Sequence, residues 1–356
     1  MSNVTGGVVF DRITKRYNDV TAVDDVSFEV RPGQLVTLLG PSGCGKTTTL
    51  RMVAGLEPAT SGRIAIGGVD VTHRAANERD VSMVFQSYAL FPHMNVLDNV
   101  CYGPLSSGAG KAKARELAHA KLRMLGLAGL EQRLPSELSG GQQQRVAVAR
   151  SLVLEPAVLL FDEPLSNLDA KLRRRVRQEI RELQQTLDLT VIYVTHDQEE
   201  ALAVSDQVIV MDRGRIAQQG TPSQLYEAPA SRFLADFIGD ANLVSGELVQ
   251  GAEGASFRAN DVSAPVRADG VPAGPATLAV RPHRLRLTAA GGGLLPAECR
   301  RAAYLGSRIE YVLATAWGEL LVFDGGIHTP LARGARAGVA FAPEDAIVLP
   351  GTGSEL

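Results

Sequence analysis

Short apolar runs alternate with longer amphipathic stretches through the first part of the chain. Val26–Val30 and Gln34–Leu39 have the composition of strands, and a Pro-Gly turn separates them. Val158–Phe161 and Val191–Thr195 are continuous apolar runs, which is typical of strands buried in a parallel sheet. Strands that alternate with helical segments predict an α/β domain. Helical spacing of apolar residues predicts helices over Lys46–Leu56, Gly110–Leu130, Arg145–Leu154, Ala170–Leu187 and Asp197–Val204.

The pattern changes near residue 240, after a predicted helix at Ser231–Phe237. From there the chain is rich in Gly, Ala and Pro, and turn signals such as Asp324-Gly325-Gly326 separate short strand-like pieces. This predicts a small second domain of antiparallel β structure. We expect an α/β domain over residues 8–238 and a β domain over residues 239–356. The expected strands of the β domain include Leu243–Val249, Thr277–Val280, Arg308–Ala314, Leu320–Phe323 and Ala346–Leu349.

Composition narrows the class of protein. A length of 356 residues accommodates two domains, and a net charge of −3 gives no basic footprint for nucleic acid. The three cysteines are few and odd in number, which suits a reducing compartment. No secretory signal and no run of about 18 apolar residues is present, so we expect a cytosolic protein that reaches a membrane only through a partner.

The segment Gly40–Thr47 fits the pattern G-x-x-x-x-G-K-[ST] and lies between a predicted strand and a predicted helix. Its glycines allow backbone N–H groups to converge on phosphate oxygens, and the helix adds its positive N-terminal end. Lys46 would neutralise the β- and γ-phosphates, and Thr47 would ligate Mg²⁺. By chance the pattern appears in roughly one chain of this length in a hundred, and the strand–loop–helix context favours phosphate binding further. The expected nucleotide-binding residues here are Gly40, Pro41, Ser42, Gly43, Cys44, Gly45, Lys46, Thr47 and Thr48.

Two carboxylates follow the apolar run Val158–Phe161. A strand of a buried sheet would deliver Asp162 to the Mg²⁺ region and Glu163 to the γ-phosphate, where Glu163 would polarise the attacking water. Asp-Glu after a strand is more often a solvated strand end. Together with the Gly40–Thr47 loop, the pair indicates a hydrolytic site.

Ser139, Gly140, Gly141 and Gln142 begin another helix. They form a second amide-rich helix start that suits an anion. A capped helix start is the structural alternative, since Ser is a favoured cap. That alternative leaves the double Gly and the triple Gln unexplained.

The segments Gly40–Thr47, Leu138–Gln142 and Val158–Glu163, in that order, resemble the ATP-binding subunits of ABC transporters. The resemblance covers about residues 8–240. It implies a P-loop NTPase cassette, with a mixed, mainly parallel sheet and a helical subdomain at about residues 88–155, followed by a small all-β, OB-like accessory domain.

The resemblance also implies roles for residues whose spacing alone says little. Gln86 matches the Q-loop glutamine that contacts Mg²⁺ or water and faces the membrane partner, and His196 matches the switch histidine at the γ-phosphate. Ser166–Asp169 matches the D-loop across the dimer interface, and Tyr17 matches the aromatic residue that stacks on adenine. Without the resemblance, Gln86 reads as a surface residue, and His196 and Tyr17 read as structural ones.

In that family two chains meet head to tail. Each ATP is then held between Gly40–Thr47 of one chain and Ser139–Gln142 of the other, so a single chain is expected to be a poor ATPase. The implied cofactors are ATP and Mg²⁺. The implied assembly is a homodimer bound to two permease subunits at the cytoplasmic face of a bacterial inner membrane, served by a periplasmic substrate-binding protein.

The C-terminal β part resembles the accessory domain of binding-protein-dependent importers of sugars, polyamines, ferric ions, sulfate or phosphonates. Phe161–Arg173 and Tyr88–His93 resemble the same group, whereas His283 stands where a Glu is common. The segment Ile238–Asn242 favours the ferric-ion and polyamine branches. Ferric ion is the expected cargo. Polyamine, phosphonate and sugar are kept as alternatives, because this subunit never touches the cargo and its sequence does not select among them.

Three rival classes differ in features visible in the sequence. Soluble ABC ATPases of DNA repair, translation or iron–sulfur assembly carry coiled-coil insertions, two cassettes or no β appendage. A P-loop kinase or GTPase has no use for Leu138–Gln142. Stand-alone exporter cassettes generally lack the C-terminal domain, whose role here (a dimer brace, a sensor of a regulator, or a binder of a small ligand) stays open.

Overall fold

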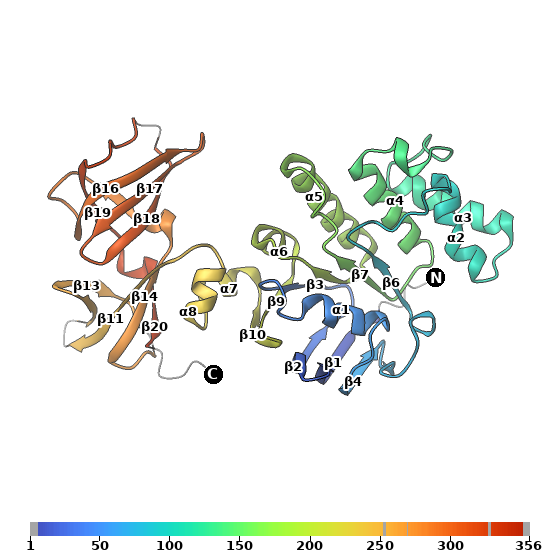
Figure 1. Ribbon diagram of the computed structural model, residues 1–356, viewed down its shortest axis with the longest axis horizontal. Coiled ribbons are helices and arrows are strands. Elements are labelled where there is room, and N and C mark those ends of the chain that lie inside the picture. The colour runs from blue at the N-terminus through green and yellow to red at the C-terminus, as the bar shows by residue number, and fades with distance from the viewer. Residues whose placement is uncertain (1–5, 252–253, 269, 327–328, 352–356) are drawn as a thin grey trace. The chain divides into compact units, whose positions relative to one another are not determined.

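The computed structural model describes residues 6–251, 254–268, 270–326 and 329–351 (Figure 1). The chain divides between Pro222 and Ser223 into two compact units. The expected domain boundary between residues 238 and 239 stays a prediction. So does the expected extent of the helical subdomain, residues 88–155.

A six-stranded sheet forms the centre of the first unit, in the order β10-β9-β3-β8-β7-β6. All its neighbouring strands are parallel except the pair β9–β10. Along β8, Val191 and Tyr193 face one core cluster while Ile192 and Val194 face another, so both faces are buried. This explains why the strands read as continuous apolar runs. The strands are β3 (Leu35–Leu39), β6 (Val81–Val84), β7 (Val158–Asp162), β8 (Thr190–Val194), β9 (Gln207–Asp212) and β10 (Arg215–Gly220).

One face of this sheet packs on α1 (Lys46–Ala54) and on an antiparallel sheet in the order β2-β1-β4-β5. Phe10 and Phe28 stack in this core, with ring centroids 4.6 Å apart. Helix α1 ends where Gly55 adopts a left-handed φ of 71°. The antiparallel strands are β1 (Val8–Tyr17), β2 (Val20–Val30), β4 (Ser61–Ile66) and β5 (Val69–Asp70).

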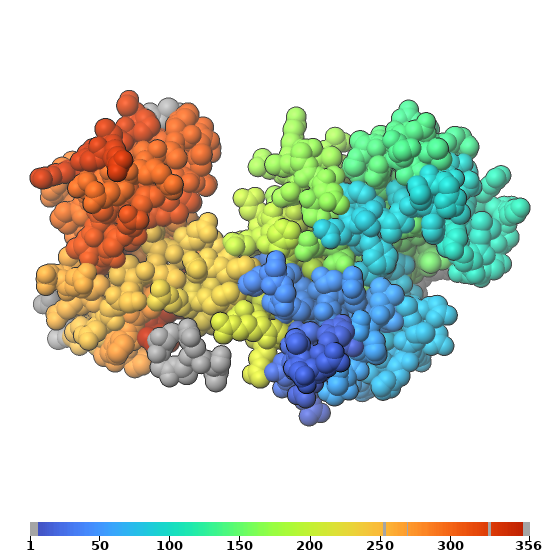
Figure 2. Space-filling view, in the orientation of Figure 1, coloured from blue at the N-terminus to red at the C-terminus, as the bar shows by residue number. Residues whose placement is uncertain are grey.

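Two helices, α4 (Gly140–Leu152) and α5 (Ala170–Leu187), contribute to the core on the other face of the sheet. A separate core cluster joins α4 to two earlier helices through side chains such as Val100, Ala118 and Val146. Figure 2 shows this helical part, coloured cyan to green, at the surface of the first unit. The remaining helices of the unit are α2 (Val96–Ser106), α3 (Lys111–Met124) and α6 (Gln198–Val204).

The second unit consists of two five-stranded antiparallel sheets around one core, preceded by two short helices. Phe257 and Trp317 meet edge to face in this core, with ring centroids 5.9 Å apart. The prediction of an all-β C-terminal domain is confirmed. One sheet contains β11 (Asn242–Gly251), β12 (Gly254–Ala259), β13 (Val262–Val266), β14 (Gly274–Val280) and β20 (Ala346–Pro350). The other contains β15 (Arg286–Thr288), β16 (Leu295–Tyr304), β17 (Ile309–Thr315), β18 (Gly318–Asp324) and β19 (Arg336–Ala340), and the helices are α7 (Pro222–Glu227) and α8 (Arg232–Phe237).

A buried arginine joins these helices to the β structure. Arg281 is 1% exposed and donates hydrogen bonds to the carbonyls of Ala235 and Tyr226, at 2.7 Å each. Its guanidinium also lies 4.2 Å from the centre of the Tyr226 ring. His283, two residues further, stacks on the Tyr226 ring with ring centroids 6.2 Å apart, and its Nδ1 lies 3.4 Å from the Tyr226 hydroxyl.

Candidate functional site

Four of the predicted segments meet at one edge of the central sheet. β3, β8, β7 and β6 are adjacent and parallel, so their carboxyl ends lie on the same side. The residues that follow these strands are Gly40–Thr47, His196, Glu163 and Gln86, while Asp162 is the last residue of β7. Residues far apart in the chain are thus brought together where ligands bind in open α/β sheets.

The phosphate loop has the conformation that its glycines allow. Gly40 has a φ of 154°, and a Cβ there would lie 2.2 Å from the carbonyl oxygen of Met211. Lys46 is 6% exposed, and its Nζ donates to the carbonyls of Gly40 (2.7 Å) and Pro41 (2.8 Å). A Cβ on Gly43 would meet no atom of the described chain within 4 Å, so the loop has open space there.

Helix α1 begins at this loop with its amides available. Its cap is Gly45, at a φ of 104°, which has no side chain that could accept from the first N–H groups. A helix start of this kind favours an anion. Ser42 and Cys44 lie within the loop, Thr48 lies in the first turn, and the Cys44 thiol lies 3.7 Å from the Lys46 ammonium.

Asp162 and Thr47 form a pair that suits a magnesium ion. The Thr47 hydroxyl donates to Asp162 Oδ1 at 3.4 Å, and burial raises the pKa of the Asp162 carboxyl. A bound cation would offset the cost of holding this carboxylate charged. Among the described residues no group of three or more His, Cys, Asp and Glu side chains forms a metal site. Mg²⁺ is commonly held by one or two carboxylates together with substrate phosphates and water, so the two residues fit it.

Glu163 and His196 are in direct contact. The distance from Glu163 Oε2 to His196 Nδ1 is 3.1 Å, and the side chains are 22% and 58% exposed. Glu163 has a φ of 46°, an unusual conformation for a residue other than Gly and one that is often found at functional sites. A cavity of about 40 Å³ is lined by both residues and is large enough for a water molecule.

Gln86 and Asp169 are exposed, and both take part in local contacts. The backbone carbonyl of Gln86 accepts a hydrogen bond from the amide of Asn167 at 3.0 Å. The Asp169 carboxylate caps α5 by accepting from the Leu172 amide at 2.9 Å. The segment Ser166–Asp169 is therefore hydrogen-bonded to the residues that follow β6, and its last residue caps the start of α5.

The segment Ser139–Gln142 is a capped helix start with a further constraint. Ser139 Oγ accepts from the Gln142 amide (3.4 Å) while Gln142 Oε1 accepts from the Ser139 amide (2.9 Å). A Cβ on Gly140 or Gly141 would lie 3.1 Å from a methyl carbon of Leu168 or Leu172 respectively. The double Gly thus permits close packing of α4 on the start of α5. Among the described residues, no hydrogen bond or ion pair joins this segment to the phosphate loop.

Tyr17 ends β1 and is 43% exposed. The Lys15 ammonium lies 4.6 Å from the ring centre and pairs with Glu57 at 2.7 Å. Partial burial and the negative charge of Glu57 raise the pKa of the Tyr17 hydroxyl. A partly exposed aromatic ring can stack on a base, and this role of Tyr17 stays a prediction.

Sequence reasoning missed a charged cluster beside His196. Arg173 lies within ion-pair distance of both Asp197 and Glu200, and all three line the cavity that Glu163 also lines. Burial raises the pKa of Glu200, which is 3% exposed. The local signal was the spacing Asp197-x-x-Glu200 directly after a strand, which is typical of a helix cap.

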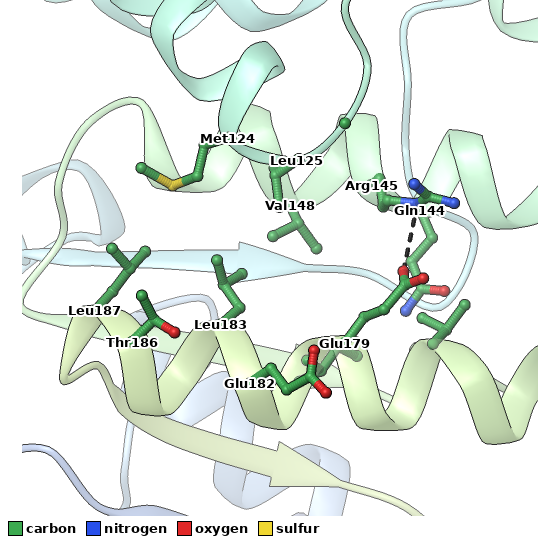
Figure 3. Close-up of a pocket in the computed structure, with 13 residues that line it drawn as sticks. Met124, Leu125, Gln144, Arg145, Val148, Glu179, Glu182, Leu183, Thr186 and Leu187 are labelled. Atoms are coloured by element: carbon green, nitrogen blue, oxygen red, sulfur yellow. Dashed lines mark ion pairs between the residues drawn. The ribbon is translucent and has the colours of Figure 1, made fainter.

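A second, mainly apolar cavity of about 400 Å³ lies between α4, α5 and the chain after α3 (Figure 3). Leu125, Val148 and Leu183 are among the side chains that line it. Gln144 also lines it and is 0% exposed. Neither amide atom of Gln144 has a hydrogen-bond partner within the part of the chain that the structure describes.

We expect Gln144→Leu to raise the free energy of unfolding by about 1 kcal/mol, because an unsatisfied buried amide costs roughly 1–3 kcal/mol. Denaturant unfolding of the nucleotide-free chain measures the change. Gln143→Leu is the matched control: its amide donates to the carbonyls of Pro135 and Leu138, so that variant should be less stable. A loss of stability in Gln144→Leu would show that the amide is paired in solution.

The sequence matches known families over both units. The ABC transporter family model matches residues 23–166, and the TOBE domain model matches residues 278–349. The Fe(3+) ions import ATP-binding protein FbpC 1 of Rhizobium meliloti (strain 1021) is 60% identical over 338 residues, covering 94% of this chain and 96% of the relative. The protein named FbpC of Vibrio cholerae serotype O1 is 47% identical over 347 residues, covering 96% of this chain and 97% of the relative.

Solved structures are similar to the first part of the chain. The dimeric ATP-binding cassette MJ0796, bound to ADP and Pi, has a TM-score of 0.54 at 29% identity. The match covers 60% of this chain and 98% of the MJ0796 chain. CbiO1 of Clostridium perfringens, part of the ABC transporter complex cbiONQ, has a TM-score of 0.57 at 28% identity. The match covers 61% of this chain and 89% of the CbiO1 chain. Among the helices that the structure describes, none combines the length and the hydropathy that a membrane span requires. The chain therefore belongs to the ABC transporter family, as one of its ATP-binding proteins.

Proposed function

We propose that this chain is the ATP-hydrolysing subunit of a ferric-ion importer, and that two copies bind ATP and Mg²⁺ head to tail to drive uptake through a membrane permease. The observation that carries the proposal is the convergence of Lys46, Asp162 and the Glu163–His196 pair at one sheet edge. ATP hydrolysis needs a phosphate cradle, a cation site and a group that orients water, and each has a candidate there.

Phosphate binding begins with Lys46. Its ammonium is held by the carbonyls of Gly40 and Pro41, which are neutral acceptors. Phosphate oxygens are charged acceptors and form stronger hydrogen bonds, so the ammonium turns from these carbonyls to the β- and γ-phosphates. The uncapped amides at the start of α1 bind the same phosphates.

Thr47 and Asp162 hold Mg²⁺, which when bound neutralises charge on the phosphates. Gln86, at the same sheet edge, provides a further contact to the ion or to its water. Glu163 accepts a proton from the attacking water, and His196 orients Glu163 through their 3.1 Å contact and reaches the γ-phosphate.

The site of one chain is half of the complete site. Ser139–Gln142 presents a helix start that no described contact joins to the phosphate loop of its own chain, and the solved relative MJ0796 is dimeric. We infer that this segment and Asp169 act on the ATP held by a second copy, while Tyr17 stacks on the adenine. ATP binding then closes the dimer, and hydrolysis releases it.

The cargo follows from the relatives rather than from any residue here. A protein named for Fe(3+) import is 60% identical over 94% of this chain. This favours ferric ion over polyamine, phosphonate or sugar, and it favours an importer over an exporter or a non-transport ATPase. We place the assembly at the cytoplasmic face of a bacterial inner membrane, with two permease subunits and a periplasmic binding protein. Residues 8–238 act as the cassette and 239–356 as the accessory domain.

Radiolabelled uptake tests this assignment. In a strain of the source bacterium that lacks this chain, ferric-ion accumulation should fall while spermidine, phosphonate and maltose uptake stay unchanged. The wild-type chain should restore iron uptake, and the Lys46→Ala chain should not. Loss of one of the other uptake activities, with iron unaffected, would assign a different cargo to the same machinery.

A further inference from the structure

Arg173 makes contacts to two different loops beside the proposed site. It lies in the first turn of α5, directly after the segment Ser166–Asp169. Its Nη2 donates to the carbonyl of Leu168 at 3.2 Å, and its Nη1 donates to Asp197 Oδ2 at 3.3 Å. Its Nε lies 3.7 Å from Glu200 Oε1. A single guanidinium therefore bridges the loop before α5 and the chain around His196.

The backbone of His196 is held from both sides by the network that Arg173 joins. The Thr195 hydroxyl donates to Glu200 Oε2 at 2.8 Å and accepts from the Asp197 amide at 3.0 Å. The Glu200 amide in turn donates to Asp197 Oδ1 at 3.1 Å. Any shift of Asp197 or Glu200 is thus transmitted to the residue between Thr195 and Asp197.

The contacts of Arg173 are not those of a tight structural pair. The side chain is 34% exposed, and its Nε has no hydrogen bond within the described chain because 3.7 Å is too long for one. A partly exposed ion pair of this kind contributes little to stability. The main consequence of Arg173 is therefore where it places its neighbours, since the planar fork can engage two acceptors at once.

We propose that Arg173 is a positioning residue that couples the segment Ser166–Asp169 to His196. The inference rests on the proposed function, in which a second chain lies against that segment and His196 acts at the γ-phosphate. Contact with the second chain moves the Leu168 carbonyl, Arg173 follows it, and Asp197 carries the change to His196. Hydrolysis is thereby linked to dimer closure, and a misplacement of about 1 Å costs up to about 100-fold in rate.

Steady-state ATPase assays of the full chain test the coupling, with rates normalised to the fraction that binds ATP. Arg173→Ala should lower kcat by about 10- to 100-fold and leave the KM for ATP within about twofold, because Arg173 makes no described contact with the phosphate loop. Added guanidinium ion should restore part of the rate. Arg173→Lys should lie between, since an ammonium cannot span the two loops. Arg175→Ala is the matched control: its side chain is 70% exposed and pairs with Glu179, so kcat should not change.

A double-mutant cycle separates positioning from a structural role. If Arg173 acts through Asp197, then Arg173→Ala combined with Asp197→Asn should lose little more than the larger single loss. A lower melting temperature with normal kcat, or a loss that guanidinium does not restore, would overturn the coupling. Glu163→Gln is assayed in parallel: if it hydrolyses ATP at the wild-type rate, the proposed function fails. If it is slow while Arg173→Ala is normal, only the coupling fails.

Discussion

Glu163→Gln should bind ATP normally and lose about 10²- to 10⁴-fold in turnover, the range expected when a general base is removed. The amide keeps the shape of the side chain and a carbonyl that can accept from His196, so the 3.1 Å contact can persist. What is lost is the ability to take a proton from water. Because hydrolysis is blocked after ATP binding, the variant should accumulate as an ATP-bound dimer.

Single-turnover hydrolysis and size-exclusion chromatography with ATP measure the two effects. Glu199→Gln is the control, since Glu199 is an exposed carboxylate in the first turn of α6, close in sequence to His196. It should hydrolyse ATP at the wild-type rate and show no trapped dimer. Wild-type hydrolysis by Glu163→Gln would remove Glu163 from the chemistry and leave water activation to another group.

Local patterns predicted the elements whose determinants lie within a few residues. The strands of the central sheet are buried on both faces, so β7 and β8 appear as apolar runs whatever surrounds them. The conformation of the phosphate loop is determined equally locally. Gly40 and Gly45 have positive φ values, which glycine adopts readily, so the motif itself specifies the turn. Predicted helix Gly110–Leu130 was too long: α3 ends at Met124, since Gly126 has a φ of 67°.

The antiparallel sheet of the first unit was largely missed because its pattern is interrupted. In β1, Arg12 has a φ of 48°, and the register shifts between Phe10 and Ile13. A bulge of this kind breaks the alternation of period two on which a strand prediction depends. The predicted strand Val26–Val30 is only the end of β2 for the same reason, since Asp25 has a φ of 52°.

Long-range contacts set the parts of the site that no local pattern could give. The glycines at 140 and 141 are needed because Leu168 and Leu172 approach them, yet these residues lie on a different helix start. The role of Arg173 likewise depends on Asp197 and Glu200, which arrive through the pairing of β7 with β8. For these two contacts, the sequence did not show which elements meet.

Lys46→Ala should weaken ATP binding itself, by about 10- to 100-fold in Kd, because a charge-assisted hydrogen bond contributes roughly 1.5–3 kcal/mol. The lysine is 6% exposed and bonded to two carbonyls of its own loop, so its ammonium is already at the site before ATP arrives. Isothermal titration calorimetry with Mg·ATP measures Kd, and thermal melting checks that the loop change leaves the fold intact.

Lys113→Ala is the control, since Lys113 is exposed on α3 and pairs only with Glu116 at 3.1 Å among the described residues. Unchanged affinity in Lys46→Ala would mean that the backbone amides alone hold the phosphates. The contrast with Glu163→Gln is the sharper test, because the first variant should fail before the dimer forms and the second only after it has closed.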